Sequence, residues 1–431
     1  MKGDNSNVNI MPIQMLASSY RNRRMSGILI IPILVRWVTV IFIFSQVCYA
    51  PFRFFMAKFG LEDIVYLPKI LLLVMIPLML LSMKRISKIF MIGVIIVGLS
   101  TVWGIINLPS VNQSLFAVWV IIPLLYGVLL ARYIFDDMVA YKNTFIAFLL
   151  VACVGVFVNV FIQYPWTGAS YEIYGVTIQA AREWWAFGVD RIGGFSAASF
   201  DAAMQIMFFS VWLMLVLKAD LSKLSLWIVS GLAIAITTTK GILGVYLILS
   251  LYFASAKLFK NNLIWRQLWV VILTINVLTL IFLPLSTVII RYDPVIHGYM
   301  NRFIFASFGD RLDYTWPASF NLLHGGAQWL LGRGLGGIGT PQTYFEPSNA
   351  LPADNLYVYL AVDLGPIAAA IILIGVYFKS SRSFLRKNSA LMPFLILLFA
   401  YGMVSNIIEA PILSLFLGVV ISKAFQNVRA P

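Results

Sequence analysis

The sequence predicts an all-α integral membrane protein with about twelve transmembrane helices, and three observations support this class. Hydrophobic residues make up 61% of the 431-residue chain and charged residues only 11%, well below the share in soluble domains. Apolar runs of about 20 residues recur along nearly the whole chain, and each is long enough to cross a bilayer. Backbone polar groups in lipid must be satisfied within each span, so we expect these runs to be helices.

The apolar runs and the charges between them predict the topology. The run from 224 to 256 forms two short spans because Lys240 and Gly241 interrupt it. With both termini cytoplasmic, most of the 31 lysines and arginines then fall on the cytoplasmic side, as the positive-inside rule requires. The predicted spans are 28–48, 64–83, 89–107, 113–131, 144–164, 199–217, 224–239, 241–256, 267–290, 354–378, 390–407 and 411–424.

The chain is predicted to be one polytopic domain, 28–431, that follows a polar cytoplasmic tail, 1–27. The tail contains no signal-peptide cleavage site before the first span. Two outer-face loops are long, 165–198 and the larger 291–353 between spans nine and ten. Most of the carboxylates also fall on the outer side, so we expect the active-site region in these two loops.

Charge and cysteine content exclude several classes of function. The net charge of +14 indicates contact with anionic membrane lipids rather than nucleic acid, because the basic residues lie in short loops between spans. Cys48 and Cys153 lie within apolar spans and form no disulfide or metal pattern. His297 and His324 have no second ligand at a useful spacing, so the sequence predicts no metal and no cofactor.

Four cationic side chains at the outer side are candidates for binding a diphosphate. An arginine fork matches phosphate oxygens and stays charged. Each candidate also has a structural interpretation: snorkelling at the interface, an ion pair with a neighbouring aspartate, or a turn residue at the surface. Arg182 lies in the same loop as Arg191, and it fits the structural interpretation better. The four candidates are Arg191, Lys240, Arg311 and Arg333.

The run GRGLGG at 332–337 matches a nucleotide-binding pattern, but it follows no strand, so the nucleotide interpretation fails. Its glycines predict a sharp turn or a close approach of the backbone to a ligand. Asp354 at the start of span ten is a candidate general base, and a helix N-cap is the alternative. His324 is the rival base because its ordinary pKa is near neutral. Asn355, Tyr357 and Glu409 are supporting candidates at the same surface.

Five segments between residue 190 and residue 411 resemble, in this order, the O-antigen polymerase and O-antigen ligase superfamily. Lys240 stands where that family usually has arginine, and Asp354 stands where its ligases have histidine. The segments are DRIGGFSAASFDAAMQ, TTTKGILG, DRLDYTW followed by LLGRGLGG, ADNLYVYLAVDLG, which contains Tyr357, and SNIIEAP.

The resemblance implies a metal-independent glycosyltransferase of the bacterial inner membrane whose active site lies on the periplasmic face. Such enzymes transfer a glycan from a polyprenyl diphosphate to an acceptor sugar and use no nucleotide sugar. Here Arg191, Lys240 and Arg311 would bind the diphosphate. Asp354 favours a polysaccharide polymerase for capsule, exopolysaccharide or O-antigen, whose donor and acceptor are both lipid-linked oligosaccharides.

Two alternatives remain open at this point. An O-antigen ligase would transfer the glycan to lipid A core instead of another repeat unit. A flippase for lipid-linked oligosaccharides would need charged residues near the bilayer midplane, and Arg36 is the main candidate there. A chain-length regulator and a flippase of the same pathway are expected partners of the polymerase.

Overall fold

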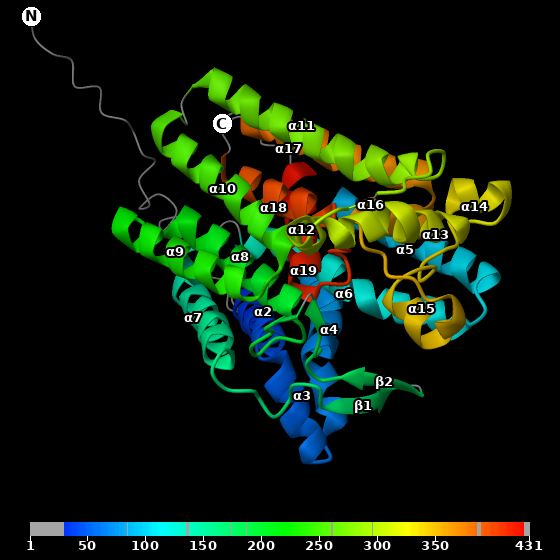
Figure 1. The fold of residues 1–431 in the computed structure, drawn as a ribbon, viewed down its shortest axis with the longest axis horizontal. Coiled ribbons are helices and arrows are strands. Elements are labelled where there is room, and N and C mark those ends of the chain that lie inside the picture. Colours follow the sequence, from blue (N-terminus) through cyan, green and yellow to red (C-terminus); the bar gives the residue numbers. More distant parts are fainter. Residues whose placement is uncertain are drawn as a thin grey trace, which may run out of the picture.

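The computed structural model describes residues 30–83, 85–134, 138–173, 175–186, 188–259, 262–294, 296–385 and 389–425. Within these residues nine helices are long and apolar enough to cross a membrane (Figure 1), which confirms the predicted all-α membrane class. The predicted tail, 1–27, lies outside the described residues. The nine are α2 (Ile30–Val47), α4 (Leu67–Ser82, after the turn η1, Glu62–Tyr66), α5 (Lys88–Asn107), α6 (Val111–Ile134), α7 (Lys142–Asn159, after η2, Met138–Tyr141), α8 (Ser199–Val216), α10 (Lys240–Phe259), α11 (Leu263–Ser286) and α17 (Pro366–Leu385).

Three shorter apolar helices occupy the other predicted spans. They are α9 (Asp220–Ile236), α18 (Met392–Gly402, after η5, Ser389–Leu391) and α19 (Pro411–Phe425). Helices α18 and α19 contain 11 and 15 residues, fewer than the roughly 17 to 25 that a helix needs to cross the hydrocarbon core, and α9 contains 17. The number twelve therefore remains a prediction.

Span ten was predicted as one helix, 354–378, and this is wrong. The structure has two helices there, α16 (Leu356–Leu364) and α17. Gly365 separates them with a φ of +90°, a conformation that favours glycine, and the following proline cannot continue α16. A side chain at Gly365 would overlap the carbonyl of Leu330, so the break lets the long insert pack against the helices.

Helix α19 is the centre of the bundle (Figure 1), and its residues from Ile412 to Val420 are all buried. A helix that is apolar on every side is typical of a core position. It packs most extensively against α6, where Gly127 and Gly418 face the partner backbone so closely that a Cβ would overlap a carbonyl. Small residues at such crossings are typical of helix packing in membranes.

The connection before α8 begins near the short helix α3 (Tyr49–Lys58), whose Ala50 N–H donates to the Phe195 carbonyl. It contains two antiparallel hairpins: β1 (Ser170–Ile173) with β2 (Val176–Gln179), and β3 (Trp185–Ala186) with β4 (Val189–Asp190).

The connection after α11 is mostly helical. It consists of α12 (Tyr299–Asp310), the π-helical turn η3 (Arg311–Thr315), α13 (Trp316–Asn321), α14 (Gly325–Leu331), α15 (Thr340–Phe345) and η4 (Pro347–Asn349). Figure 1 shows α13, α14 and α15 on the right of the bundle and β1 and β2 at the lower right. The two long connections therefore gather on one side.

The glycine-rich run, 332–337, runs between α5, α6 and α16. Gly334 has a φ of +93°, and a Cβ there would overlap the backbone of Gly104 in α5. The sequence predicted a close approach to a ligand, but the backbone of this run approaches the chain's own helices instead. The hydrogen-bond partners of the run are the carbonyls of Ser100 and Val362, the side chains of Trp103 and Gln113, and the Asp363 carboxylate.

Candidate functional site

A cavity of about 560 Å³ lies where the two long connections meet the start of α8 and the α18–α19 turn. We call it the site cavity. Its wall contains three carboxylates, which belong to Asp201, Asp354 and Glu409, together with the guanidinium of Arg182. Acidic and basic groups from four separate parts of the chain therefore converge on one hollow, as is typical of binding sites.

Arg311 lies in the π-helical turn after α12. Its Nη2 is 3.1 Å from Oδ2 of Asp354 and 3.1 Å from the carbonyl oxygen of Val404, to which it donates. Its Nη1 donates to the Ser307 carbonyl. Its buried Nε has no hydrogen-bond partner within the described residues. The guanidinium is thus fixed in place and still has one unused donor.

Asp354 is available for this contact because the neighbouring residue caps the helix. The side-chain oxygen of Asn355 accepts the N–H groups of Tyr357 and Val358, and its amide donates to the Met403 carbonyl. The sequence left open whether Asp354 is the N-cap, and the structure assigns that position to Asn355. The Asp354 side chain, 39% exposed, lines the site cavity.

Arg182 and Arg191 stack on the same indole ring. Their guanidinium carbons lie 4.5 and 3.9 Å from the ring centroid of Trp184, a cation–π geometry. Burial, followed by the positive charges of Arg182 and Arg311, lowers the pKa of Arg191. The buried Nε of Arg191 has no hydrogen-bond partner in the described part of the chain. Arg191 is therefore repelled by neighbouring positive charges, and a bound anion would reduce this repulsion.

Lys240 is the first residue of α10 and lies near Arg191. Thr238, two residues earlier, is the one described non-glycine residue with a positive φ, at 56°. Such a conformation is costly for a β-branched residue and marks a constrained turn. The turn sets Lys240 over the Phe303 ring at 4.3 Å and within electrostatic reach of Arg191. Gly241 packs against Val404, whose carbonyl binds Arg311.

Glu409 lies in the turn between α18 and α19. Its Oε1 accepts the backbone N–H of Thr340 at 2.7 Å. Burial raises its pKa to about 7, against opposing effects from Thr340, Asn406 and Lys69. A carboxylate with this pKa is suited to accept a proton near neutral pH.

Three other predicted residues have structural contacts instead. Arg333 is buried and donates to both oxygens of Glu346, at 3.0 and 3.1 Å, so the anion that it faces belongs to its own chain. Tyr357 is 1% exposed and packs in the core. His324 is exposed ahead of α14 and is absent from the lining of the site cavity. We do not carry these three forward as site residues.

Asp201 and Tyr401 line the site cavity but gave no signal in the sequence. An aspartate in the first turn of a helix is favourable for the helix dipole alone, so Asp201 was not distinctive. Tyr401 lies within an apolar run. The electrostatic interactions of Tyr401 with Asp201, Arg311 and Asp354 reveal its position only once the chain is folded.

Comparisons with known proteins do not add to this description. The chain matched no protein-family model, no curated protein and no solved structure.

The Arg333–Glu346 pair predicts a stability effect. Burial would raise the pKa of Glu346, but hydrogen bonds from Arg333, Asn349 and Gln113 and the Arg333 charge lower it overall. Glu346→Gln leaves the buried guanidinium uncompensated, so we expect a loss of about 3–5 kcal/mol and a lower melting temperature. The depressed pKa means that this stabilisation is present above the ordinary glutamate pKa and disappears as the pH falls below it.

The exposed pair Lys257–Asp220 provides the control, since both side chains are more than two-thirds exposed. Asp220→Asn should leave the melting temperature unchanged. An unchanged melting temperature in Glu346→Gln would contradict the structural role of Arg333.

Proposed function

We propose that the chain is a polysaccharide polymerase that transfers a glycan from a polyprenyl diphosphate to another lipid-linked repeat unit. One observation carries the proposal: Arg182 lines the site cavity, Arg191 shares the Trp184 ring with Arg182, and Arg311 is bound to Asp354 in the cavity wall. Lys240 lies within electrostatic reach of Arg191, and the buried Nε atoms of Arg191 and Arg311 have no hydrogen-bond partner among the described residues. A lipid-linked diphosphate combines the anion that such cations attract with a tail that the membrane holds. The order of the five sequence segments supports the same function.

The proposed reaction needs only positioning and electrostatics. The acceptor hydroxyl oxygen forms a bond to the anomeric carbon of the donor, and the bond from that carbon to the diphosphate oxygen breaks. The electron pair leaves with the diphosphate, where Arg191, Arg311 and Lys240 stabilise the added charge. The hydroxyl proton passes to a carboxylate of the site cavity.

We assign the base role to Glu409 and an orienting role to Asp354. Asp354 is bound to Arg311 and helps to fix the guanidinium in place. Burial raises the pKa of Glu409 to about 7, which suits proton transfer near neutral pH. Its proximity to the Thr340 N–H keeps it oriented toward the cavity wall.

The contacts of Arg36 give the flippase alternative less support. Its Nη2 donates to the Ala140 carbonyl, and its guanidinium carbon lies 5.5 Å from the Tyr141 ring centroid. It is therefore bound to the segment between α6 and α7 instead of facing a pathway through the bundle. The ligase alternative shares the proposed chemistry and differs in the acceptor. We place the reaction on the periplasmic face of a bacterial inner membrane, with a flippase and a chain-length regulator of the pathway as partners.

The first test uses purified protein and a short lipid-diphosphate-linked repeat unit without nucleotide sugar. Wild type should produce a ladder of longer glycans on a gel. Arg191→Gln and Arg311→Gln should each lower the rate by about 100-fold or more, because a preorganised charge at the leaving group is lost. Arg302→Gln is the matched control, since Arg302 is exposed and its Nε donates to the nearby Ile296 carbonyl.

Two results would contradict this proposal. One is a folded wild type that transfers the repeat to lipid A core and makes no ladder. The other is a ladder that both arginine variants still produce at the rate of Arg302→Gln.

The second test is the pH profile of polymerisation. If Glu409 accepts the proton, its protonated form is inactive, so the rate should rise about tenfold per pH unit below about 7 and level off above it. Glu409→Gln should be at least about 100-fold slower at the plateau. Asp201→Asn should still show the rise of the polymerisation rate with pH. If Glu409→Gln kept the rate and the profile of wild type, the base would be another carboxylate of the cavity.

A further inference from the structure

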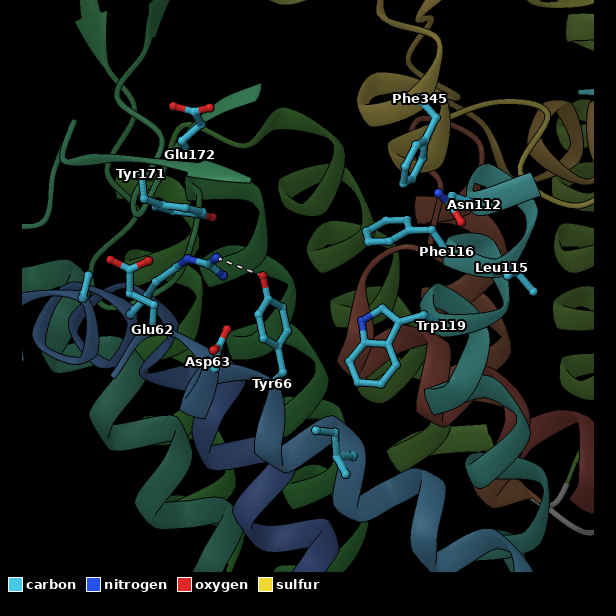
Figure 2. A pocket seen from close by; sticks show the side chains of 13 residues that line it. Glu62, Asp63, Tyr66, Asn112, Leu115, Phe116, Trp119, Tyr171, Glu172 and Phe345 are labelled. Carbon is cyan, nitrogen blue, oxygen red and sulfur yellow. Dashed lines mark hydrogen bonds between the residues drawn. The ribbon is translucent and has the colours of Figure 1, made fainter. Parts of the chain in front are cut away.

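A second cavity of about 670 Å³ lies between α3, η1, α4, α6, β1 and α15. We call it the aromatic cavity. Figure 2 shows Tyr66 and Tyr171 on one side of it and Phe116, Trp119 and Phe345 on the other. Its volume is within the range of roughly 300–1,000 Å³ that is typical of small-molecule sites.

The tyrosine side of this cavity is rigid. Arg53 is only 8% exposed and donates to the hydroxyls of Tyr49 at 2.8 Å and Tyr66 at 3.4 Å. Its guanidinium carbon lies 3.6 Å from the ring centroid of Tyr171. The positive charge is therefore used to hold three aromatic side chains, and their faces are preorganised before any ligand arrives.

Most of the remaining polar groups are acceptors of hydrogen bonds. Glu62, Asp63 and Glu172 carry exposed carboxylates at the cavity, and Asn112 adds an amide (Figure 2). Hydroxyl groups donate strong hydrogen bonds to carboxylates. The C–H faces of a sugar ring are apolar and pack on aromatic faces. Flat aromatic walls combined with carboxylates therefore fit a polyhydroxylated ring better than an acyl chain, which offers no donors.

The same carboxylates exclude a second diphosphate site. Three negative side chains repel an anion, and the one cation of the lining, Arg53, is covered by tyrosines. The two cavities thus differ in charge, since cations lie at or beside the site cavity and the aromatic cavity offers carboxylates. A lipid-linked glycan likewise has a charged diphosphate at one end and sugar rings at the other. One would take a diphosphate, and the other would take neutral or amino sugars.

The two cavities share neighbouring residues and one helix. Tyr49 lines the site cavity and bonds Arg53 of the aromatic cavity. Helix α15 contributes Thr340 and Thr343 to the first and Phe345 to the second. Lys69 lies 5.0 Å from the Trp119 ring centroid and interacts electrostatically with Glu409. A chain of sugar rings that leaves the site cavity would reach the aromatic cavity next.

We infer that the aromatic cavity binds the oligosaccharide segment of the glycan, at rings removed from the diphosphate. This inference rests on the proposed function for its place in the reaction, but sugar binding itself can be measured without any reaction. Trp119 and Tyr171 provide the stacking faces, and Glu172 accepts ring hydroxyls. The cavity would hold the glycan while its end reacts, which favours long products over single transfers.

The test is calorimetric titration of purified full-length protein with glycan fragments that mild acid releases from the surface polysaccharide of the source cells. These fragments carry neither lipid nor diphosphate. Wild type should bind them, Trp119→Ala should weaken binding at least tenfold, and Glu172→Gln should weaken it several-fold. Trp185→Ala is the matched control, because Trp185 is 70% exposed on β3 and lines neither cavity. Glu172 is exposed, so Glu172→Gln tests the cavity even if Trp119→Ala fails to fold.

Each outcome is decisive. Absence of binding to wild type at millimolar fragment, or equal binding by wild type, Trp119→Ala and Glu172→Gln, would overturn the inference. Arg191→Gln separates the two proposals, since it should abolish the polymer ladder and leave fragment binding unchanged. Fragment binding that depends on Trp119, in a protein that makes no ladder, would support the sugar site and refute the polymerase. A ladder of unchanged length in Trp119→Ala, together with unchanged fragment binding, would support the polymerase and refute the sugar site.

Discussion

The structure depends on satisfying the polar backbone of the non-helical run 332–337, which lies among apolar helices. Unpaired N–H and C=O groups there would each cost several kcal/mol in a medium without water. Asp363 accepts the N–H of Gly337, and α5 and α6 supply further partners from Ser100, Trp103 and Gln113. The run anchors α14 and α15 to the bundle, and α15 forms part of both cavities.

The second constraint is the repulsion among cations that the fold brings together. Arg182 and Arg191 share one indole ring, and Arg311 is bound to Asp354 and two carbonyls. These contacts hold the charges in place without fully neutralising them. An anion that enters such a site reduces the repulsion among the cations, and this favours its binding. The same cations stabilise negative charge that develops on a leaving group. In the proposed reaction, the site cavity would act through electrostatics and the aromatic cavity through stacking.

Hydropathy alone predicted most of the fold, because a lipid solvent permits few alternatives to apolar helices. It failed at Gly365, where a positive φ and the following proline end α16, and it does not establish that the short helices α18 and α19 cross the membrane. Local sequence also could not show that Arg333 pairs with Glu346, since a turn of the glycine-rich run brings them together. The sequence singled out Arg191, Arg311 and Asp354 as candidates because a charge beside membrane spans is costly, whereas Asp201 resembled an ordinary helix start.

The central claim, that these cations bind a polyprenyl diphosphate, is tested most directly by equilibrium binding of farnesyl diphosphate to the purified protein. Arg191→Gln and Arg311→Gln should each weaken binding at least tenfold, a loss of about 1.4 kcal/mol or more. Farnesyl monophosphate should bind more weakly than the diphosphate, and added salt should weaken both. Equal affinity for farnesol and farnesyl diphosphate, or unchanged binding in both variants, would contradict the account.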